Sequence, residues 1–429
     1  MDIYIPIELW DREFESRCLL ASKLLNLGFT VILGKKNQIF HYVLTKKNGI
    51  FFGIWGAHKN FLTRYTILKK NNFLIFTIDE EGLITLDEDT YKKLRCDKNT
   101  LNTIDCYFSW SEYHKKIIKS VNQNTNCIVS SNPRLDITKK NNKISNTRVK
   151  KILFISSFAL SNHYLGSKNY LIQLEKNKVI VGKKSINQYK KLLDFQEKNQ
   201  KYFLEAVNYI SNQHHDYDIS LKIHPSENEK YWVEKLNSNV RIIKSGSIMS
   251  KISDSDIVIH NYCTSAVEAY AQDKISIAFR PFKSKYIECH KLPYIVSLNC
   301  YNKKNLKNYL QSDKLKILVG QIREKNKKKI TQFVDINLDS SSVISKNIYK
   351  LSRNIKTCKN ANFISMIFYH LKFKLLIYYS YLRRNTYVDH KSGNFSLDMI
   401  IKQLNFLNKD NKYIYKKVTN DIIEINPNV

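Results

Sequence analysis

Three consecutive acids, Asp79, Glu80 and Glu81, stand directly before Gly82 and directly after the apolar run NFLIFTI. Carboxylates this close repel one another, which can raise the pKa of one of them into the range of a general acid or base. A solvated acidic turn would have the same sequence. The position at the end of an expected strand makes these acids candidates for acid–base chemistry.

A second polar group follows the run NCIVSS and includes Asn132, Arg134 and Asp136. Pro133 stiffens this turn, because its ring fixes one backbone dihedral. The guanidinium of Arg134 can bind a carboxylate or phosphate with two parallel hydrogen bonds, and Asp136 adds a carboxylate. The same two residues could instead pair only with the protein and hold a domain junction.

Histidines mark two further strand ends. Asn162 and His163 follow the run KKILFISS, and a histidine there can bind an anionic group or shuttle a proton, although a single histidine more often has a structural role. Lys222, His224 and Pro225 follow the run DISLKIHP. Both positions lie where a cationic or proton-carrying side chain could meet a ligand.

A helix is expected to begin near Thr264, after the strand-like run DIVIHN that ends in Asn261. Free N–H groups at a helix start, with the hydroxyls of Thr264 and Ser265, can bind a phosphate; the same hydroxyls can also cap the helix. Glu268 lies one turn further and could hold ribose hydroxyls. These residues predict a nucleotide-binding strand end.

The elements that position these residues alternate between short β-rich runs and helical periods, which predicts an α/β fold with parallel sheets. A polar, basic break at 137–149 separates an expected Rossmann-like domain at 1–140 from a second at 150–320. Ligands in such doubly wound sheets bind beyond the carboxyl ends of the strands. Residues 321–429 are expected to form a basic helical extension whose stretch 363–382 either packs on the second domain or lies on an anionic membrane.

Composition narrows the class of protein. The 429 residues include 70 Lys and Arg against 38 Asp and Glu, a formal charge of +32, which suits nucleic acid, an anionic membrane or an acidic substrate. Lysines occur in every segment rather than in one patch, so no nucleic-acid partner is expected. Eight cysteines without a CxxC pair, and an acidic start without a signal peptide, predict a cytoplasmic protein.

Several known signatures are absent from the sequence. It lacks GxGxxG, GxxxxGK[ST], HExxH and GxSxG, which argues against dinucleotide oxidoreductases, P-loop NTPases, zincins and α/β-hydrolases. The segment Asp254-Ser255-Asp256 precedes a strand rather than following one, so we interpret it as a turn. No metal is expected.

Taken together and in this order, the segments resemble bacterial surface carbohydrate biosynthesis proteins related to the retaining β-Kdo glycosyltransferases. The acidic and His-Pro elements are also similar to those of bacterial sialyltransferases. Ser131 stands where such relatives more often have glycine. The matching segments are IPIELWDREFESRCLLASKLLNLGFTVILG, IDEEG, SNPRLD, ILFISSFALSNH, LKIHPSE and VIHNYCTSAVEAY, with a weaker match at DHKSGNFSLD.

The resemblance implies a GT-B architecture, with two Rossmann-like domains facing across a cleft. It also implies transfer of Kdo from CMP-Kdo to a glycan or lipid-linked glycan at the inner face of the cytoplasmic membrane. No metal or other cofactor is expected for this reaction. Retention needs a carboxylate nucleophile, for which we expect Asp136, and an acid/base, for which we expect Glu80, with Glu81 as the substitute for either role. The full set is catalytic Asp136, Glu80, Glu81 and His163; substrate-binding Arg134, Asn132, Asp79 and Asn162; and nucleotide-binding Lys222, His224, Pro225, Asn261, Thr264, Ser265 and Glu268.

Other functions remain open at this point. The same fold could use a CMP-nonulosonic acid or a CDP-polyol as donor. A non-catalytic scaffold of polysaccharide assembly is a further possibility, against which the intact acids at 79–81 and 136 argue.

Overall fold

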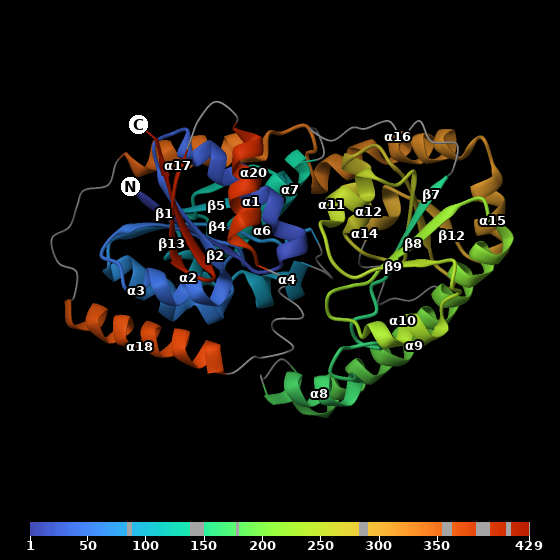
Figure 1. The fold of residues 1–429 in the computed structure, drawn as a ribbon, viewed down its shortest axis with the longest axis horizontal. Helices are drawn as coiled ribbons and strands as arrows, with labels where there is room; N and C mark the ends of the chain where they lie inside the picture. The colour runs from blue at the N-terminus through green and yellow to red at the C-terminus, as the bar shows by residue number, and fades with distance from the viewer. Residues whose placement is uncertain are drawn as a thin grey trace. The chain divides into compact units, whose positions relative to one another are not determined.

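The computed structural model describes residues 1–83, 88–137, 150–176, 180–282, 291–353, 363–382, 395–408 and 413–428 (Figure 1). The chain forms two compact units. The first comprises Met1–Lys140, Thr331–Asn385 and Ser392–Val429, and the second comprises Asn141–Ile330 and Thr386–Lys391. Each unit is built around one sheet of mainly or wholly parallel strands.

The sheet of the first unit has the order β13-β14-β2-β1-β3-β4-β5-β6. Strands β1 to β6 are mutually parallel, and the central ones are continuous apolar runs buried on both faces, as expected for a sheet covered by helices. These strands are β1 (Asp2–Ile7), β2 (Thr30–Lys35), β3 (Gly49–Gly53), β4 (Phe73–Ile78), β5 (Cys106–Ser109) and β6 (Cys127–Val129).

The helices between these strands include α1, which packs against β1 and β2 and also contacts α7, α17 and α20. Helix α18 packs against α2. The bounds are α1 (Trp10–Leu25), α2 (Lys36–Val43), α3 (Leu62–Lys70), α4 (Glu88–Arg95), α5 (Lys98–Leu101), α6 (Glu112–Val121), α7 (Pro133–Asp136), α17 (Ser340–Ser352), α18 (Phe363–Leu382) and α20 (Leu397–Leu407), with a short 3-10 helix, η1 (Lys59–Phe61).

The end of the chain differs from the expected helical extension. Besides helices it contains two strands, β13 (Tyr413–Thr419) and β14 (Ile422–Pro427), and β14 pairs antiparallel with β2. At Gly34 the two strands approach closely, since an added Cβ would lie 2.6 Å from the carbonyl oxygen of Asp421. The segment from Thr331 therefore contributes mainly to the first unit, by completing its sheet, instead of standing apart from it.

The second unit has a six-stranded sheet of order β12-β11-β10-β7-β8-β9, and all its strand pairs are parallel. Its strands are β7 (Lys151–Ile155), β8 (Asp218–Lys222), β9 (Arg241–Ile243), β10 (Ile257–His260), β11 (Ile275–Phe279) and β12 (Leu298–Cys300). Its helices are α8 (Ser167–Lys176), α9 (Gly182–Gln213), α10 (Glu229–Lys235), α11 (Ile248–Ser253), α12 (Ser265–Ala271), α14 (Lys291–Ile295), α15 (Lys303–Gln311) and α16 (Leu315–Phe333).

The predicted α/β class with two Rossmann-like domains is confirmed. Each apolar run that precedes a candidate site residue contains a parallel strand, namely β4, β6, β7, β8 or β10. Most of the predicted linker, residues 138–149, lies outside the described residues, as do 389–394 of the weak C-terminal match. Among the helices that the structure describes, none is long and apolar enough to cross a membrane.

Candidate functional site

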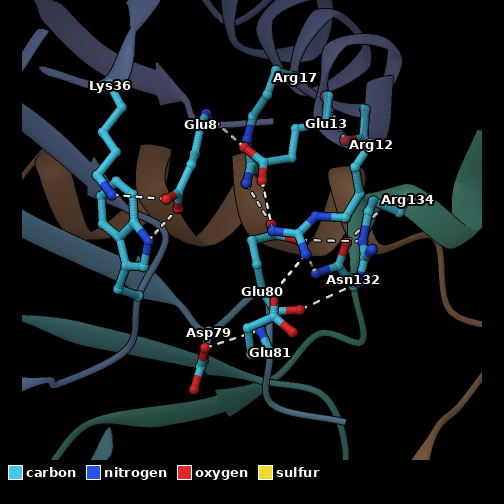
Figure 2. Close-up of polar contacts among 12 residues, drawn as sticks. Glu8, Arg12, Glu13, Arg17, Lys36, Asp79, Glu80, Glu81, Asn132 and Arg134 are labelled. Atoms are coloured by element: carbon cyan, nitrogen blue, oxygen red, sulfur yellow. Dashed lines mark hydrogen bonds and ion pairs between the residues drawn. The ribbon is translucent and has the colours of Figure 1, made fainter. Parts of the chain in front are cut away.

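The acidic cluster lies at the carboxyl end of β4, as predicted, and much of it is buried. Asp79 is 0% exposed and Glu80 is 3% exposed, whereas the side chain of Glu81 is 38% exposed. Figure 2 shows arginines from α1 and from the segment after β6 converging on these acids. Of the three, Glu81 is therefore the carboxylate that solvent or a ligand can reach.

Glu80 is held between two buried arginines. Its carboxylate pairs with Arg17 Nη2 and lies 3.2 Å from Arg134 Nε, and its carbonyl oxygen accepts a hydrogen bond from Arg134 Nη2. Burial alone would raise the pKa of Glu80, but the nearby guanidinium charges, led by that of Arg17, outweigh burial and lower it. Glu80 is thus ionised near neutral pH, as a base or an anchor for arginines would be.

Glu81 pairs with Arg12, which also binds the buried carboxylate of Glu13 through its Nη2 atom at 2.9 Å. The positive charge of Arg12 lowers the pKa of Glu81 to about 2. Glu13 in turn accepts a hydrogen bond from the backbone N–H of Glu8. Arg12 therefore links the first turn of α1 to the one accessible acid of the cluster.

The polar atoms of Asp79 are bound by neighbouring groups of the protein. Its carboxylate accepts hydrogen bonds from the Tyr91 hydroxyl at 2.8 Å and from the Glu81 backbone N–H at 3.0 Å, while its carbonyl accepts one from Trp110 Nε1. Burial raises the pKa of Asp79. Gly82 follows in the same turn. A larger residue would not fit there, because an added Cβ would lie 2.7 Å from the rings of His114 and Trp110.

The segment after β6 brings two predicted residues to the same cluster. Asn132 caps α7, accepting from the Arg134 backbone N–H, and its amide lies 3.3 Å from Glu80. The guanidinium of Arg134 lies 5.4 Å from the centre of the Trp110 ring. Ser131, just before them, has φ +61°, in the left-handed region that favours glycine. This explains why a glycine would suit the position.

Asp136 is engaged elsewhere within the first unit. Its carboxylate accepts hydrogen bonds from the backbone N–H groups of Ser340 at 2.9 Å and Ser341 at 2.7 Å, and from the Ser341 hydroxyl at 2.6 Å. It is 6% exposed, and burial raises its pKa. Asp136 thus caps the start of α17, which agrees with the alternative that it pairs with the protein, although the sequence did not indicate these donors. Its predicted part as nucleophile stays a prediction.

In the second unit, the loops after β7 and β8 are tied together. Glu227 accepts hydrogen bonds from the Phe158 backbone N–H at 2.7 Å and from Trp232 Nε1 at 2.8 Å. Asn162 and Asn228 exchange hydrogen bonds, since each accepts one from the other through a backbone carbonyl. Glu227 is fully buried, and burial raises its pKa to about 7.

The predicted histidines occupy these two loops. His163 is 2% exposed, stacks on Tyr170 with ring centres 3.8 Å apart, and accepts a hydrogen bond from the Leu165 backbone N–H. His224 is partly exposed and accepts one from Ser226, and Pro225 beside it is also partly exposed. Lys222 is buried and donates to the carbonyl of Lys244. His224 is therefore the better placed of the two histidines to meet a ligand.

The carboxyl end of β10 carries the remaining predicted residues. The amide atoms of Asn261, which is 1% exposed, have no hydrogen-bond partner within the described ranges. Thr264 precedes α12 without capping it through its side chain, and Ser265 and Glu268 are buried in that helix. His260 bonds Ser297, and burial lowers its pKa to about 3.

The structure thus brings Glu80, Glu81, Asn132 and Arg134 together, and separately gathers Asn162, His163 and His224. Sequence reasoning missed Arg17 and Glu227. A signal for Arg17 exists: together with Glu13 it occupies the helical stripe that Leu20 and Leu24 continue, a position that predicts burial. Among the described residues, no group of three or more His, Cys, Asp or Glu side chains could hold a metal ion.

Two Rossmann-like units with polar clusters at the carboxyl ends of their strands define a GT-B fold, and comparison with solved structures agrees. S. aureus MnaA in a co-structure with UDP is 13% identical, with a TM-score of 0.51, over 84% of this chain and 99% of MnaA. The wall teichoic acid polymerase TagF is 10% identical, with a TM-score of 0.52, over 83% of this chain and 90% of TagF. The sequence matches no family model and no curated protein.

Proposed function

We propose that this protein is a GT-B glycosyltransferase of cell-surface polysaccharide synthesis that transfers an ulosonic acid, Kdo or a relative, from a CMP-activated donor to a glycan acceptor. The observation that carries the proposal is the carboxylate of Glu81, which is accessible and is kept ionised by Arg12 at the end of a parallel strand. A retaining transferase needs such an ionised carboxylate beside the reacting carbon.

In this proposal the carboxylate of Glu81 attacks the anomeric carbon of the sugar. A bond forms between them as the bond to the CMP phosphate breaks, and CMP leaves with the electron pair. The acceptor hydroxyl then displaces Glu81 and loses its proton to a base. All three acids have partners in the protein, and exposure favours Glu81 as the attacking group, because Asp136 and Glu80 are nearly buried whereas the side chain of Glu81 is 38% exposed.

Glu80, Asn132 and Arg134 act together in this proposal. Glu80 orients Arg134 and Arg17, and the positive charge of these arginines would attract the sugar carboxylate. Charged groups stabilise a bound anion best when they are fixed before the substrate arrives. Burial against Phe52 fixes the guanidinium of Arg17, and burial against Trp110 fixes that of Arg134.

The nucleotide would bind at the carboxyl edge of the sheet in the second unit. His224 and Pro225 are partly exposed there, next to the loop that carries Asn162 and His163, and Thr264 directly precedes α12 after the neighbouring β10. A half-exposed histidine can donate a hydrogen bond to a departing phosphate. MnaA and TagF, which share the fold, are named in structures with UDP and CDPG respectively, which supports a pyrimidine nucleotide.

A second candidate is transfer of a polyol phosphate from a CDP-activated donor. The likeness to TagF favours it, because the structure with CDPG has a TM-score of 0.51 to this chain. This reaction would attack phosphorus rather than an anomeric carbon, so it would need no carboxylate nucleophile.

The test is intact-protein mass spectrometry after incubation with CMP-Kdo in the absence of acceptor. We expect released CMP and a covalent sugar adduct that proteolysis places on the peptide containing Glu81. Glu81→Gln should abolish the adduct, and the matched variant Glu112→Gln, at an exposed acid of the same unit, should keep it. An adduct on Asp136 would restore the sequence-based assignment. Turnover of CDP-glycerol but not of CMP-Kdo would overturn the proposal in favour of the second candidate.

A further inference from the structure

Helix α18 (Phe363–Leu382) presents an apolar face that the first unit leaves uncovered. Ile367, Phe368, Leu371, Leu375 and Tyr378 are between 47% and 63% exposed. At about 100° per residue, these five positions fall within roughly a third of the helix circumference. Soluble proteins rarely leave such an apolar stripe in contact with water unless it serves as an interaction site.

The opposite side of α18 anchors the helix to the unit. Phe373 is 6% exposed, and its ring centre lies 5.4 Å from that of Tyr42 in α2. Tyr369 also packs against the core of the first unit. Helix α18 lies beside α2 (Figure 1), and its packing there fixes the direction of the exposed stripe.

Basic side chains flank the stripe. Lys374 and His370 lie on one side of it and Lys372 on the other, all three are exposed, and no acid occurs anywhere in α18. Burial, then Arg64 and Lys372, lower the pKa of His41 in the neighbouring helix α2 to about 4, in keeping with positive surroundings. Lysines beside an apolar face can extend along it and place their ammonium groups among lipid phosphates.

From this arrangement we infer that α18 lies in the surface of an anionic phospholipid bilayer, with the stripe Ile367, Phe368, Leu371, Leu375 and Tyr378 among the acyl chains and Lys372 and Lys374 at the headgroups. Charge selects this occupant, because a formal charge of +32 repels a second copy of the chain and attracts an anionic surface. Because Lys372 and Lys374 lie near its middle, α18 fits the water–lipid interface of a bilayer better than its hydrocarbon core. The inference does not depend on which sugar the protein transfers.

The test is co-flotation of the full chain with vesicles of phosphatidylglycerol and phosphatidylcholine, compared with phosphatidylcholine alone. We expect binding to the anionic vesicles and at least about tenfold weaker binding to the neutral ones. The triple variant Ile367→Gln, Leu371→Gln, Leu375→Gln should weaken anionic binding at least about tenfold. Its control is Ile172→Gln, Val233→Gln, Ile317→Gln, which alters three equally exposed apolar residues and should bind as the wild type does.

A charge pair separates local contact from overall attraction. Lys372→Glu with Lys374→Glu and Lys304→Glu with Lys316→Glu each lower the net charge from +32 to +28, since each Lys→Glu change removes two charges, and all four lysines are exposed. We expect only the first pair to weaken anionic binding by more than about threefold. Equal loss in the two pairs would overturn the assignment to α18.

A direct readout does not rely on weakened binding. The four native tryptophans are all buried, so a Phe368→Trp variant adds the one exposed indole. Its emission should shift to the blue on anionic vesicles and be quenched by brominated acyl chains. An absence of shift and quenching would overturn the inference. So would a wild-type dimer in solution that the triple glutamine variant converts to a monomer, because the stripe would then bind a second copy.

Discussion

Glu80 offers the sharpest test of how the site is held together. Its carboxylate pairs with Arg17, which is 0% exposed, and with Arg134, which is 3% exposed. The variant Glu80→Gln keeps the shape of the side chain and removes its charge. Two buried guanidinium groups would then share one neutral amide.

The expected cost follows from the burial. Removing one partner of a buried ion pair typically costs about 3–5 kcal/mol, because the remaining charge stays out of water without compensation. For a domain of this size each kcal/mol lowers the melting temperature by about 2–4 °C, so the first unit should melt roughly 6–20 °C earlier. Glu112→Gln removes the same charge from a residue that is 68% exposed, and it should cost less than about 1 kcal/mol.

Differential scanning calorimetry measures this, since it separates the transitions of the two units where they differ. Dependence on pH adds a second check. The pKa of Glu80 is lowered in the folded state, so its contribution to stability is present above the pKa of the unfolded chain and is lost as the pH falls through the lower folded value. If Glu80→Gln melts within about 1 °C of the wild type, the buried ion pairs of Glu80 do not hold the site together.

Three further outcomes follow from individual contacts. Ser131→Gly should stabilise the protein by about 1 kcal/mol in urea unfolding by relieving the left-handed φ, and Ser131→Ala, which keeps the Cβ, should not. Asp136→Ala should destabilise the first unit by about 2–4 kcal/mol, since three donors at the start of α17 lose their acceptor; an unchanged melting temperature would contradict the capping role. Glu227 has its pKa raised from 4.5 to about 7, so stability should fall by ~3 kcal/mol as the pH rises through that interval. Glu227→Gln should flatten this slope, which thermal unfolding at several pH values measures.

The sequence predicted the two sheets because their strands are unbroken apolar runs bounded by polar turns. It did not predict β13 and β14, which mix aromatic or aliphatic residues with lysine and glutamate rather than forming unbroken apolar runs, as in Tyr413 to Lys417. Such a pattern is typical of an exposed edge strand, and it resembles the polar composition of the rest of the C-terminal segment. β14 joins the rest of the sheet by pairing with β2, almost 400 residues away in the chain, so no local pattern could indicate this pairing.

The candidate site was predicted in part for the same reason. Parallel strands end at one edge, and this placed Glu80 with Asn132 and Arg134 correctly. The capping of α17 by Asp136 depends on a contact across about 200 residues, which neither spacing nor residue type reveals. The surroundings also change the chemistry of the acids: the sequence predicts a raised pKa for one of them, and burial raises the pKa of Asp79, whereas the arginines around Glu80 and Glu81 lower the pKa of both.

Nucleotide binding is the most direct test of the proposed reaction. Thermal unfolding of the purified protein is followed with CMP, CDP, UMP, UDP and GDP at equal concentrations. A nucleotide that binds only the folded state at about 100 times its dissociation constant adds about 2.7 kcal/mol of stability. We expect CMP to stabilise the wild type and to lose most of this effect in His224→Ala. Stabilisation by CDP, a uridine nucleotide or GDP without stabilisation by CMP would contradict the proposed reaction.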